Sequence, residues 1–157
     1  MISVVVATLN DERRLAGALA PLIEAAVDGL VRQAIVADGG STDATLEIAE
    51  DAGATVVAGD LAAGLAATRQ PWVMILDVGA RLEPGWERAA HLHMQAVPAR
   101  AGRIVPTASG WLGKIMPGAP VGLLAPTAMA VGGRGTVGER ARALGAVRLG
   151  FAAAVVG

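Results

Sequence analysis

The sequence predicts an α/β fold in which a doubly wound, mostly parallel sheet carries helices on both faces. Three observations support this class. Short apolar runs alternate with segments of helical spacing through about residue 97, the order typical of parallel sheets with right-handed crossovers. These runs are almost continuously apolar, as in strands buried on both faces. Three of them also end in polar clusters.

The first strand is expected at residues 2–7, and a helix follows it. Asn10 is suited to be the N-cap of that helix, and the acids Asp11 and Glu12 suit the positive end of the helix dipole. Apolar residues then recur at helical spacing. Pro21 lies inside this pattern and is expected to kink the helix or to end it early.

The second strand is expected at residues 33–37 and runs into the segment DGGSTD at 38–43. Its two glycines allow a tight turn and the close approach of a ligand to the main chain. Ser41 or Thr42 is expected to cap the next helix, and Gly53 to end it. The later elements are expected, in order, as a strand at 54–58, a helix at 61–68, a strand at 72–76, a helix from 84 to about 97, short strands at 103–105 and 121–124, and a helix at 137–144.

Polar side chains cluster after the first, second and fourth expected strands. The clusters are Thr8 to Glu12, Asp38 to Asp43, and Asp77. Because ligands of such sheets bind beyond the carboxyl ends of the strands, we expect these clusters to meet in one crevice. Asp38 would accept hydrogen bonds from a base or a ribose there, or it would only stabilise the turn. Asp77 would meet a metal ion or a sugar, or it would be exposed at the strand tip.

Composition and charge exclude several classes of protein. The 157 residues are 54% hydrophobic and 17% charged, which suits a folded single domain. The absence of cysteine excludes disulfides and Cys-ligated metal sites. Residues 1–60 hold ten acids and three bases, a net charge of −7, whereas residues 101–157 hold one acid and six bases, a net charge of +5. The basic last third would face a diphosphate or a lipid headgroup, or it would only cover the acidic half.

Three segments make the chain similar to the family 2 glycosyltransferases of the GT-A fold. They are SVVVATLNDE at 3–12, IVADGGSTD at 35–43 and ILDVGARLEPGW at 75–86, in the order and at the spacing of that family. The resemblance covers about the first two-thirds of the chain, and a weaker similarity to the family follows at 122–126. It implies one GT-A-like domain over 1–157, with a nucleotide-binding half at 1–100 and a shortened acceptor-side half at 101–157.

The resemblance also implies a nucleotide-diphosphate sugar, carried by UDP or GDP, as the donor. It places Thr8, Asn10 and Glu12 beside the nucleotide and Asp38 on its base or ribose, and Gly39 and Ser41 belong to the same binding segment. Asp77 would be the first acid of the family's Asp-x-Asp motif, which holds the Mg²⁺ or Mn²⁺ that bridges the diphosphate.

The chain departs from that pattern at the metal motif and at the catalytic base. Gly79 stands where the second acid is expected, and Glu83 would reach back only if the loop bends. Glu139 is the sole acid after Glu87, so it is the one late candidate for the base, unless it only pairs with a nearby arginine. A second hypothesis is that arginines of the basic last third neutralise the diphosphate in place of a metal. The candidates are Arg134, Arg140 and Arg142.

Two other functions are alternatives to sugar transfer. A non-catalytic nucleotide-sugar-binding or interaction module would keep the fold without the metal site. A nucleotidyltransferase is disfavoured because the loop after the first strand lacks glycine. Nucleic-acid binding is disfavoured by the acidic strand edge and the few aromatic residues. We expect a cytoplasmic protein, with peripheral membrane contact and a homodimer as further expectations. Trp111 would belong to the core, stack on a sugar or lie at a membrane surface.

Overall fold

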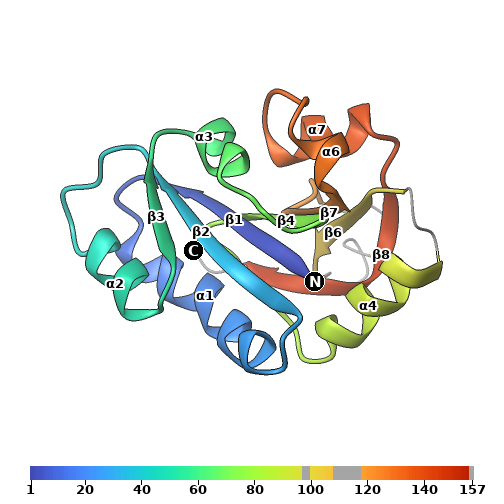
Figure 1. The fold of residues 1–157 in the computed structure, drawn as a ribbon, viewed down its shortest axis with the longest axis horizontal. Helices are drawn as coiled ribbons and strands as arrows, with labels where there is room; N and C mark the ends of the chain where they lie inside the picture. The colour runs from blue at the N-terminus through green and yellow to red at the C-terminus, as the bar shows by residue number, and fades with distance from the viewer. Residues whose placement is uncertain (97–99, 108–117, 156–157) are drawn as a thin grey trace.

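The computed structural model describes residues 1–96, 100–107 and 118–155. The described strands form one sheet in the order β3-β2-β1-β4-β7-β6-β8-β5, with helices on both faces (Figure 1). The strands are β1 (Ile2–Thr8), β2 (Val31–Asp38), β3 (Thr55–Ala58), β4 (Trp72–Asp77), β5 (Ala80–Leu82), β6 (Gly102–Pro106), β7 (Gly122–Pro126) and β8 (Val147–Val155). The helices are α1 (Glu12–Val27), α2 (Thr45–Asp51), α3 (Leu61–Ala66), α4 (Trp86–Ala96), α6 (Thr127–Ala130) and α7 (Val137–Ala143).

The sheet is mixed and mostly parallel, as the sequence predicts. Strand β1 lies between β2 and β4 and is parallel to both, and β2 is parallel to β3. Strand β7 pairs antiparallel with both β4 and β6, while β8 is parallel to β6 and antiparallel to β5. The chain therefore moves outward from β1 to β3 and returns through α3 to β4, on the other side of β1. This reversal is the switch point at which open α/β sheets bind ligands.

Side chains alternate between two apolar clusters, one on each face of the sheet. In β1, Val4 and Val6 pack with Leu15 of α1, whereas Val5 packs with Leu65 of α3. Helices α1, α2 and α4 lie on the first face and α3, α6 and α7 on the second (Figure 1). Fully burying a side chain of this size contributes roughly 1.5–3 kcal/mol, so the continuous apolar run of β1 is explained by its burial on both faces.

The start of α1 differs from the prediction. Asn10 has a positive φ of 53° and lies before the helix, and Asp11 is the cap residue without a side-chain capping bond. The expectation that Asn10 caps α1 is therefore wrong. Pro21 lies inside α1, which continues to Val27, so Pro21 does not end the helix early. Buried Leu22 and Ala25 lie beyond the proline, and their packing offsets the hydrogen bond that proline removes.

The caps of α2 were also predicted only in part. Ala44 is the residue at the N-cap position, and the N–H of Thr45 is satisfied by the Asp43 carboxylate at 3.0 Å. Neither Ser41 nor Thr42 is the cap, because Ser41 instead bonds to Asp38 and Asn10. Gly53 follows the last turn with a φ of 71°, the conformation that favours glycine after a helix. That part of the prediction is confirmed.

Three described elements were not expected from the sequence: β5, α6 and β8. Strand β8 runs from Val147 to Val155 and joins β6 to β5. The strands expected at 103–105 and 121–124 and the helix expected at 137–144 are present, with bounds that differ by a residue or two. Trp111, named for membrane contact, lies outside the described residues.

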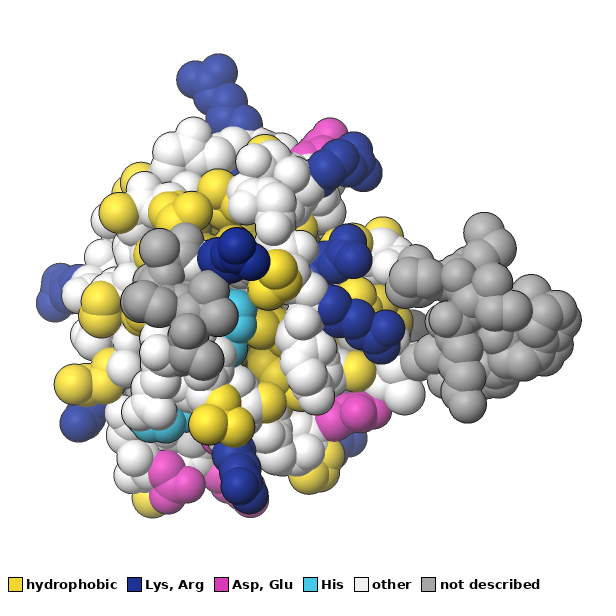
Figure 2. All heavy atoms as spheres, turned by 90° about the vertical axis from the view of Figure 1, so that its right-hand side faces the viewer, with side chains coloured by type: hydrophobic (Ala, Val, Ile, Leu, Met, Phe, Trp, Pro, Cys, Tyr) yellow, Lys and Arg dark blue, Asp and Glu magenta, His cyan; other side chains and the backbone are white. Residues whose placement is uncertain are grey.

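The face that carries α4 and β8 mixes basic, apolar and neutral side chains. In Figure 2 the basic side chains of the described residues are spread over this face rather than gathered in one patch. Such a distribution does not form a compact anion-binding surface. Among the helices of residues 1–96, 100–107 and 118–155, none has the length and apolar content needed to cross a bilayer.

Candidate functional site

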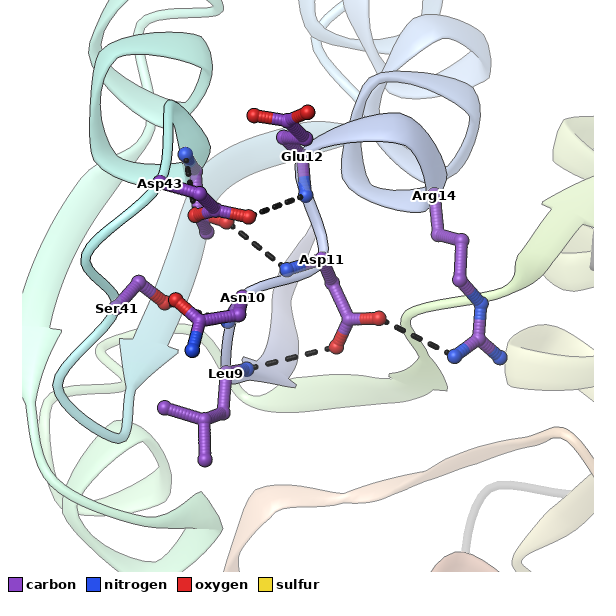
Figure 3. Close-up of polar contacts among 8 residues, drawn as sticks. Leu9, Asn10, Asp11, Glu12, Arg14, Ser41 and Asp43 are labelled. Atoms are coloured by element: carbon purple, nitrogen blue, oxygen red, sulfur yellow. Dashed lines mark hydrogen bonds and ion pairs between the residues drawn. The ribbon is translucent and has the colours of Figure 1, made fainter.

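Two loops at the carboxyl edge of the sheet are bound together by hydrogen bonds. The first follows β1 and the second follows β2 (Figure 3). The Asn10 N–H donates to Ser41 Oγ at 2.9 Å, and the Thr42 N–H donates to Asn10 Oδ1 at 2.8 Å. The Ala44 N–H donates to Glu12 Oε2 at 3.2 Å. The side chains of Asn10 and Glu12 thus hold the neighbouring loop in place.

Asp38 ends β2 and holds the turn that follows. It is buried, and its Oδ2 accepts the N–H groups of Gly40 and Ser41, both at 2.9 Å. Its Oδ1 accepts the Ser41 hydroxyl. Burial by itself would raise the pKa of Asp38, but the hydrogen bonds from Ser41 and Gly40 outweigh it, and the pKa lies below its ordinary value. Asp38 is therefore ionised and already bonded by its own turn.

Thr8 and Gly39 lie side by side beneath this turn. The Gly39 N–H donates to the Thr8 carbonyl at 2.9 Å, and Thr8 is opposite Asp38 in the sheet register. The Thr8 hydroxyl is buried and has no hydrogen-bond partner among the described residues. A buried hydroxyl without a partner is uncommon in folded proteins. Thr8 thus lies close to Asp38, as the sequence predicts.

Asp77 ends β4 on the other side of β1, opposite Ala7. Its side chain is exposed, and its carboxylate makes no hydrogen bond or ion pair with the part of the chain that the structure describes. Loss of hydration to the surrounding protein raises the pKa of Asp77, and the positive charge of Arg14 opposes that change. Asp77 is therefore a carboxylate available to a ligand.

A cleft of about 570 Å³ opens in front of Asp77. Its lining comes from the ends of β1 and β4, from Leu61 at the start of α3, and from the start of α7, with Thr136 and Glu139. Arg14 lines this cleft and also a neighbouring pocket of about 360 Å³, which contains Asn10 and Glu12. The structure thus brings Asp77 and Glu139 to one cleft and Asn10 and Glu12 to the pocket beside it. Thr8, Asp38, Gly39 and Ser41 line neither of the two, although they lie at the same edge of the sheet.

Glu139 is the third residue of α7 and closes a capping box with Thr136. Its carboxylate accepts the Thr136 N–H at 2.8 Å, and the Thr136 hydroxyl accepts the Glu139 N–H at 3.3 Å. The bonds from Thr136 lower the pKa of Glu139. The motif Thr136-x-x-Glu139 is a known sequence signature of a helix start, so the sequence contained the signal for this role.

The arginines proposed to replace the metal do not gather at the cleft. Arg140 is buried and donates to the main-chain carbonyls of Gly135 and Ala130, both at 3.0 Å. Arg134 and Arg142 do not line the cleft. The arginine that does line it, Arg14, was not singled out from the sequence. Its signal is the spacing Asp11-x-x-Arg14 on the first turn of α1, where the two side chains pair at 3.2 Å.

The side chains around Asp77 do not form a protein-held divalent metal site. A divalent ion at a phosphate site is usually held by one or two carboxylates together with phosphate oxygens and waters, so a site held by protein alone needs further side-chain ligands. Gly79 supplies no side chain, and Glu83 is bonded by the Thr107 hydroxyl and does not line the cleft. Within the described ranges, no group of three His, Asp or Glu side chains is placed to hold a metal. Glu83 follows β5 and does not reach back to the cleft of Asp77.

Comparison with known proteins agrees with this arrangement. The family model described as glycosyl transferase family 2 matches residues 3–96. These residues include the loop after β1, the turn at Asp38 and the end of β4. None of the curated proteins matches the chain.

Solved structures share the fold. Glucosyl-3-phosphoglycerate synthase from Mycobacterium tuberculosis, in complex with Mn²⁺, UDP and glucosyl-3-phosphoglycerate, is 22% identical with a TM-score of 0.73, over 100% of this chain and 72% of that one. The same enzyme with Mn²⁺, UDP-glucose and phosphoglyceric acid is 24% identical with a TM-score of 0.65, over 83% of this chain and 58% of that one. A further mycobacterial protein is 24% identical with a TM-score of 0.60, over 83% of this chain and 54% of that one.

Proposed function

Because the chain belongs to glycosyl transferase family 2, we propose that it transfers a sugar from a nucleoside-diphosphate donor to an acceptor hydroxyl. The observation that carries this proposal is the cleft at the switch point of the sheet, where Asp77 faces the start of α7. In the reaction, the bond between the sugar and the diphosphate breaks and a bond from the acceptor oxygen to the sugar forms. The acceptor loses a proton, which a base must take.

The donor is a UDP- or GDP-sugar. Its diphosphate and sugar occupy the cleft of about 570 Å³, and its nucleoside extends into the pocket of about 360 Å³ beside the loop after β1. The similar mycobacterial synthase is described with UDP and UDP-glucose, which supports a uridine donor as the first to test. We further propose that residues 1–100 hold the nucleotide and residues 101–157 form the acceptor side.

The loop residues have a positioning role in this proposal. Asn10, Glu12, Ser41 and Asp38 fix the two loops through the hydrogen bonds described above. Such preformed loops lower the cost of ordering the site when the donor binds. Thr8 and Gly39 belong to the same edge and join the two loops through the bond from the Gly39 N–H to the Thr8 carbonyl.

Asp77 is the better placed of the two cleft carboxylates to accept the proton. The sequence singled out Glu139 for this role, but the Glu139 carboxylate is bonded to Thr136 and has a lowered pKa, so it is a weak base. Asp77 has a raised pKa and no hydrogen-bond partner among the described residues. We therefore assign proton acceptance to Asp77 and capping of α7 to Glu139.

A second function, the non-catalytic nucleotide-sugar-binding module, has its own support. Gly79 removes one acid from the region of Asp77, and Glu139 is bound within the capping box. A module of this kind would keep the donor pocket and lack turnover. Peripheral membrane contact, a homodimer and a cytoplasmic location remain predictions from the sequence.

The test is titration calorimetry of the protein with UDP- and GDP-sugars, followed by an assay of sugar release and transfer. Donor binding with release or transfer that falls at least about a hundredfold in Asp77→Asn supports the enzyme. Binding without turnover supports the module. If no nucleoside-diphosphate sugar binds, both functions are wrong.

A further inference from the structure

Arg14 occupies a position that the proposed function does not yet use. It lies on the first turn of α1 and lines both the cleft in front of Asp77 and the pocket of the loop after β1. Among the described residues that line the cleft, it is the only basic one. A ligand that extends from one space to the other would pass its guanidinium group.

The guanidinium group is only partly engaged by the protein. Its Nη1 donates to Asp11 Oδ1 at 3.2 Å, and the side chain is 41% exposed. Its Nε is buried and has no hydrogen-bond partner among the described residues. Leaving such a donor without a partner has a free-energy cost. An incoming phosphate would bind the exposed part of the guanidinium group, because guanidinium forms charge-assisted bonds with phosphate.

The space beside Asp77 favours an arginine over a divalent ion. Asp77 has no second carboxylate beside it, since position 79 is glycine and Glu83 is bonded by Thr107. The positive charge of Arg14 is close enough to act on the Asp77 carboxylate. A divalent cation placed there would be repelled by Arg14 and would find one protein ligand.

We propose that Arg14 binds the diphosphate of the donor, and that this chain binds its donor without a divalent cation. The inference rests on the proposed function, since it concerns the donor of the same cleft. It differs from what the similar synthase structures contain, because those are described with Mn²⁺. In this chain the fixed charge of one side chain takes the place of the ion.

The test is calorimetry of UDP-glucose and of uridine with the full chain, in EDTA and in Mn²⁺. We expect the wild type to bind UDP-glucose in EDTA with a Kd within about threefold of that in Mn²⁺. Arg14→Ala should weaken UDP-glucose binding in EDTA by about tenfold or more, the range of a lost charge-assisted bond. Uridine, which has no phosphate, should bind both proteins equally.

Two variants separate charge from structure. Arg14→Lys keeps the charge without the paired donors, so its affinity should lie between those of the wild type and Arg14→Ala. Arg88→Ala removes an exposed arginine of α4 that lines neither the cleft nor the pocket beside it, and should bind as the wild type does. Thermal unfolding and circular dichroism confirm that each variant is folded, and if Arg14→Ala is unfolded the comparison is made with Arg14→Lys.

The outcomes are distinct. Binding that appears only with Mn²⁺ overturns this inference and leaves the proposed function intact. Binding in EDTA that Arg14→Ala and Arg14→Lys leave unchanged overturns the role of Arg14. Absence of UDP- and GDP-sugar binding in both conditions overturns the proposed function itself.

Discussion

Asp38 binds Ser41 twice, accepting its main-chain N–H at 2.9 Å and its hydroxyl. Ser41 in turn accepts the N–H of Asn10 from the neighbouring loop. A carboxylate at the end of β2 therefore fixes two loops through one serine. The stability of this edge of the sheet therefore depends on the hydrogen bonds from Asn10 to Ser41 and from Ser41 to Asp38, and Asp38 is buried.

Asp38→Ala should lower the free energy of unfolding by about 1–3 kcal/mol, because it removes the charged acceptor of the Gly40 and Ser41 N–H groups and of the Ser41 hydroxyl. Asp38→Asn keeps one carbonyl oxygen for these donors and should cost less. Urea unfolding followed by circular dichroism measures both. Asp51→Ala, which changes an exposed acid in the last turn of α2, is the matched control. A loss for Asp38→Ala no larger than that of the control would contradict the role of the turn.

The same carboxylate predicts how stability depends on pH. Asp38 and Asp43 both have a pKa below the ordinary value of 3.8 in the folded protein, with the bonds from Ser41 and Thr45 as the stabilising causes. A lowered folded pKa contributes stability above the unfolded pKa, and this stability is lost as the pH falls through the folded pKa. We expect the free energy of unfolding to fall below about pH 4. Asp38→Asn should show a smaller fall over the same range, and an equal fall would show that Asp38 is not linked to unfolding.

Two glycines in helices should respond oppositely to alanine. A Cβ added at Gly17 of α1 meets nothing within 4 Å, whereas one added at Gly64 of α3 lies 2.7 Å from Val5 Cγ1 and 3.0 Å from Ala37 Cβ. Gly17→Ala should stabilise the protein by about 0.5–1 kcal/mol through helix propensity. Gly64→Ala should destabilise it by about 1–3 kcal/mol through overpacking. Thermal unfolding of the pair checks the sign, and the same sign for both would show that α3 is not packed tightly on β1.

The capping box of α7 allows the structural and chemical roles of Glu139 to be separated. Glutamine also serves in capping boxes, so Glu139→Gln should change the unfolding free energy by less than about 0.5 kcal/mol. Thr136→Ala removes the cap and should cost about 1 kcal/mol. Because we assign proton acceptance to Asp77, Glu139→Gln should also keep sugar transfer within about threefold of the wild type. A fall of about a hundredfold in transfer, with unchanged stability, would instead make Glu139 the base.

The charge of Asp77 sets the pH dependence of donor affinity. Asp77 has a raised pKa because it is partly desolvated, with Arg14 opposing that change. If the donor binds without metal, protonation of Asp77 removes a repulsion from the diphosphate, and affinity should rise as the pH falls through the Asp77 pKa. Asp77→Asn should bind UDP-glucose with little dependence on pH. Calorimetry from neutral to mildly acidic pH measures this, and a metal held by Asp77 would produce the opposite trend.

The sequence predicted the nucleotide-side half well because its strands are marked by composition. Strand β1 is a run of apolar, β-branched residues, and such a run has few structural alternatives once both faces are covered. Strand β8 was missed because Gly150 interrupts it and its inward residues alternate with exposed ones such as Arg148. Strand β5 has three residues, too few to show any period.

The site was predicted at the level of segments and less well at the level of contacts. That Asp38 and Asp77 reach one edge follows from parallel topology. The Asp38 carboxylate is already hydrogen-bonded within its own turn. This depends on the hydroxyl of Ser41 and on the φ of 105° at Gly40, and neither feature can be predicted from residue spacing. Arg14 was overlooked because its importance comes from the cleft beside it, and clefts are tertiary features.

The cleft wall at α7 joins parts of the chain that are far apart in sequence, since Ala7 and Glu139 face the same space. The space therefore exists only after α7 has packed against β4 and β7, beside the end of β1. A molecule that fills it bridges the beginning and the end of the folded chain, and its binding free energy is added to the stability of the whole fold. A bound donor would therefore stabilise the protein against global unfolding, and not only against the opening of a single loop.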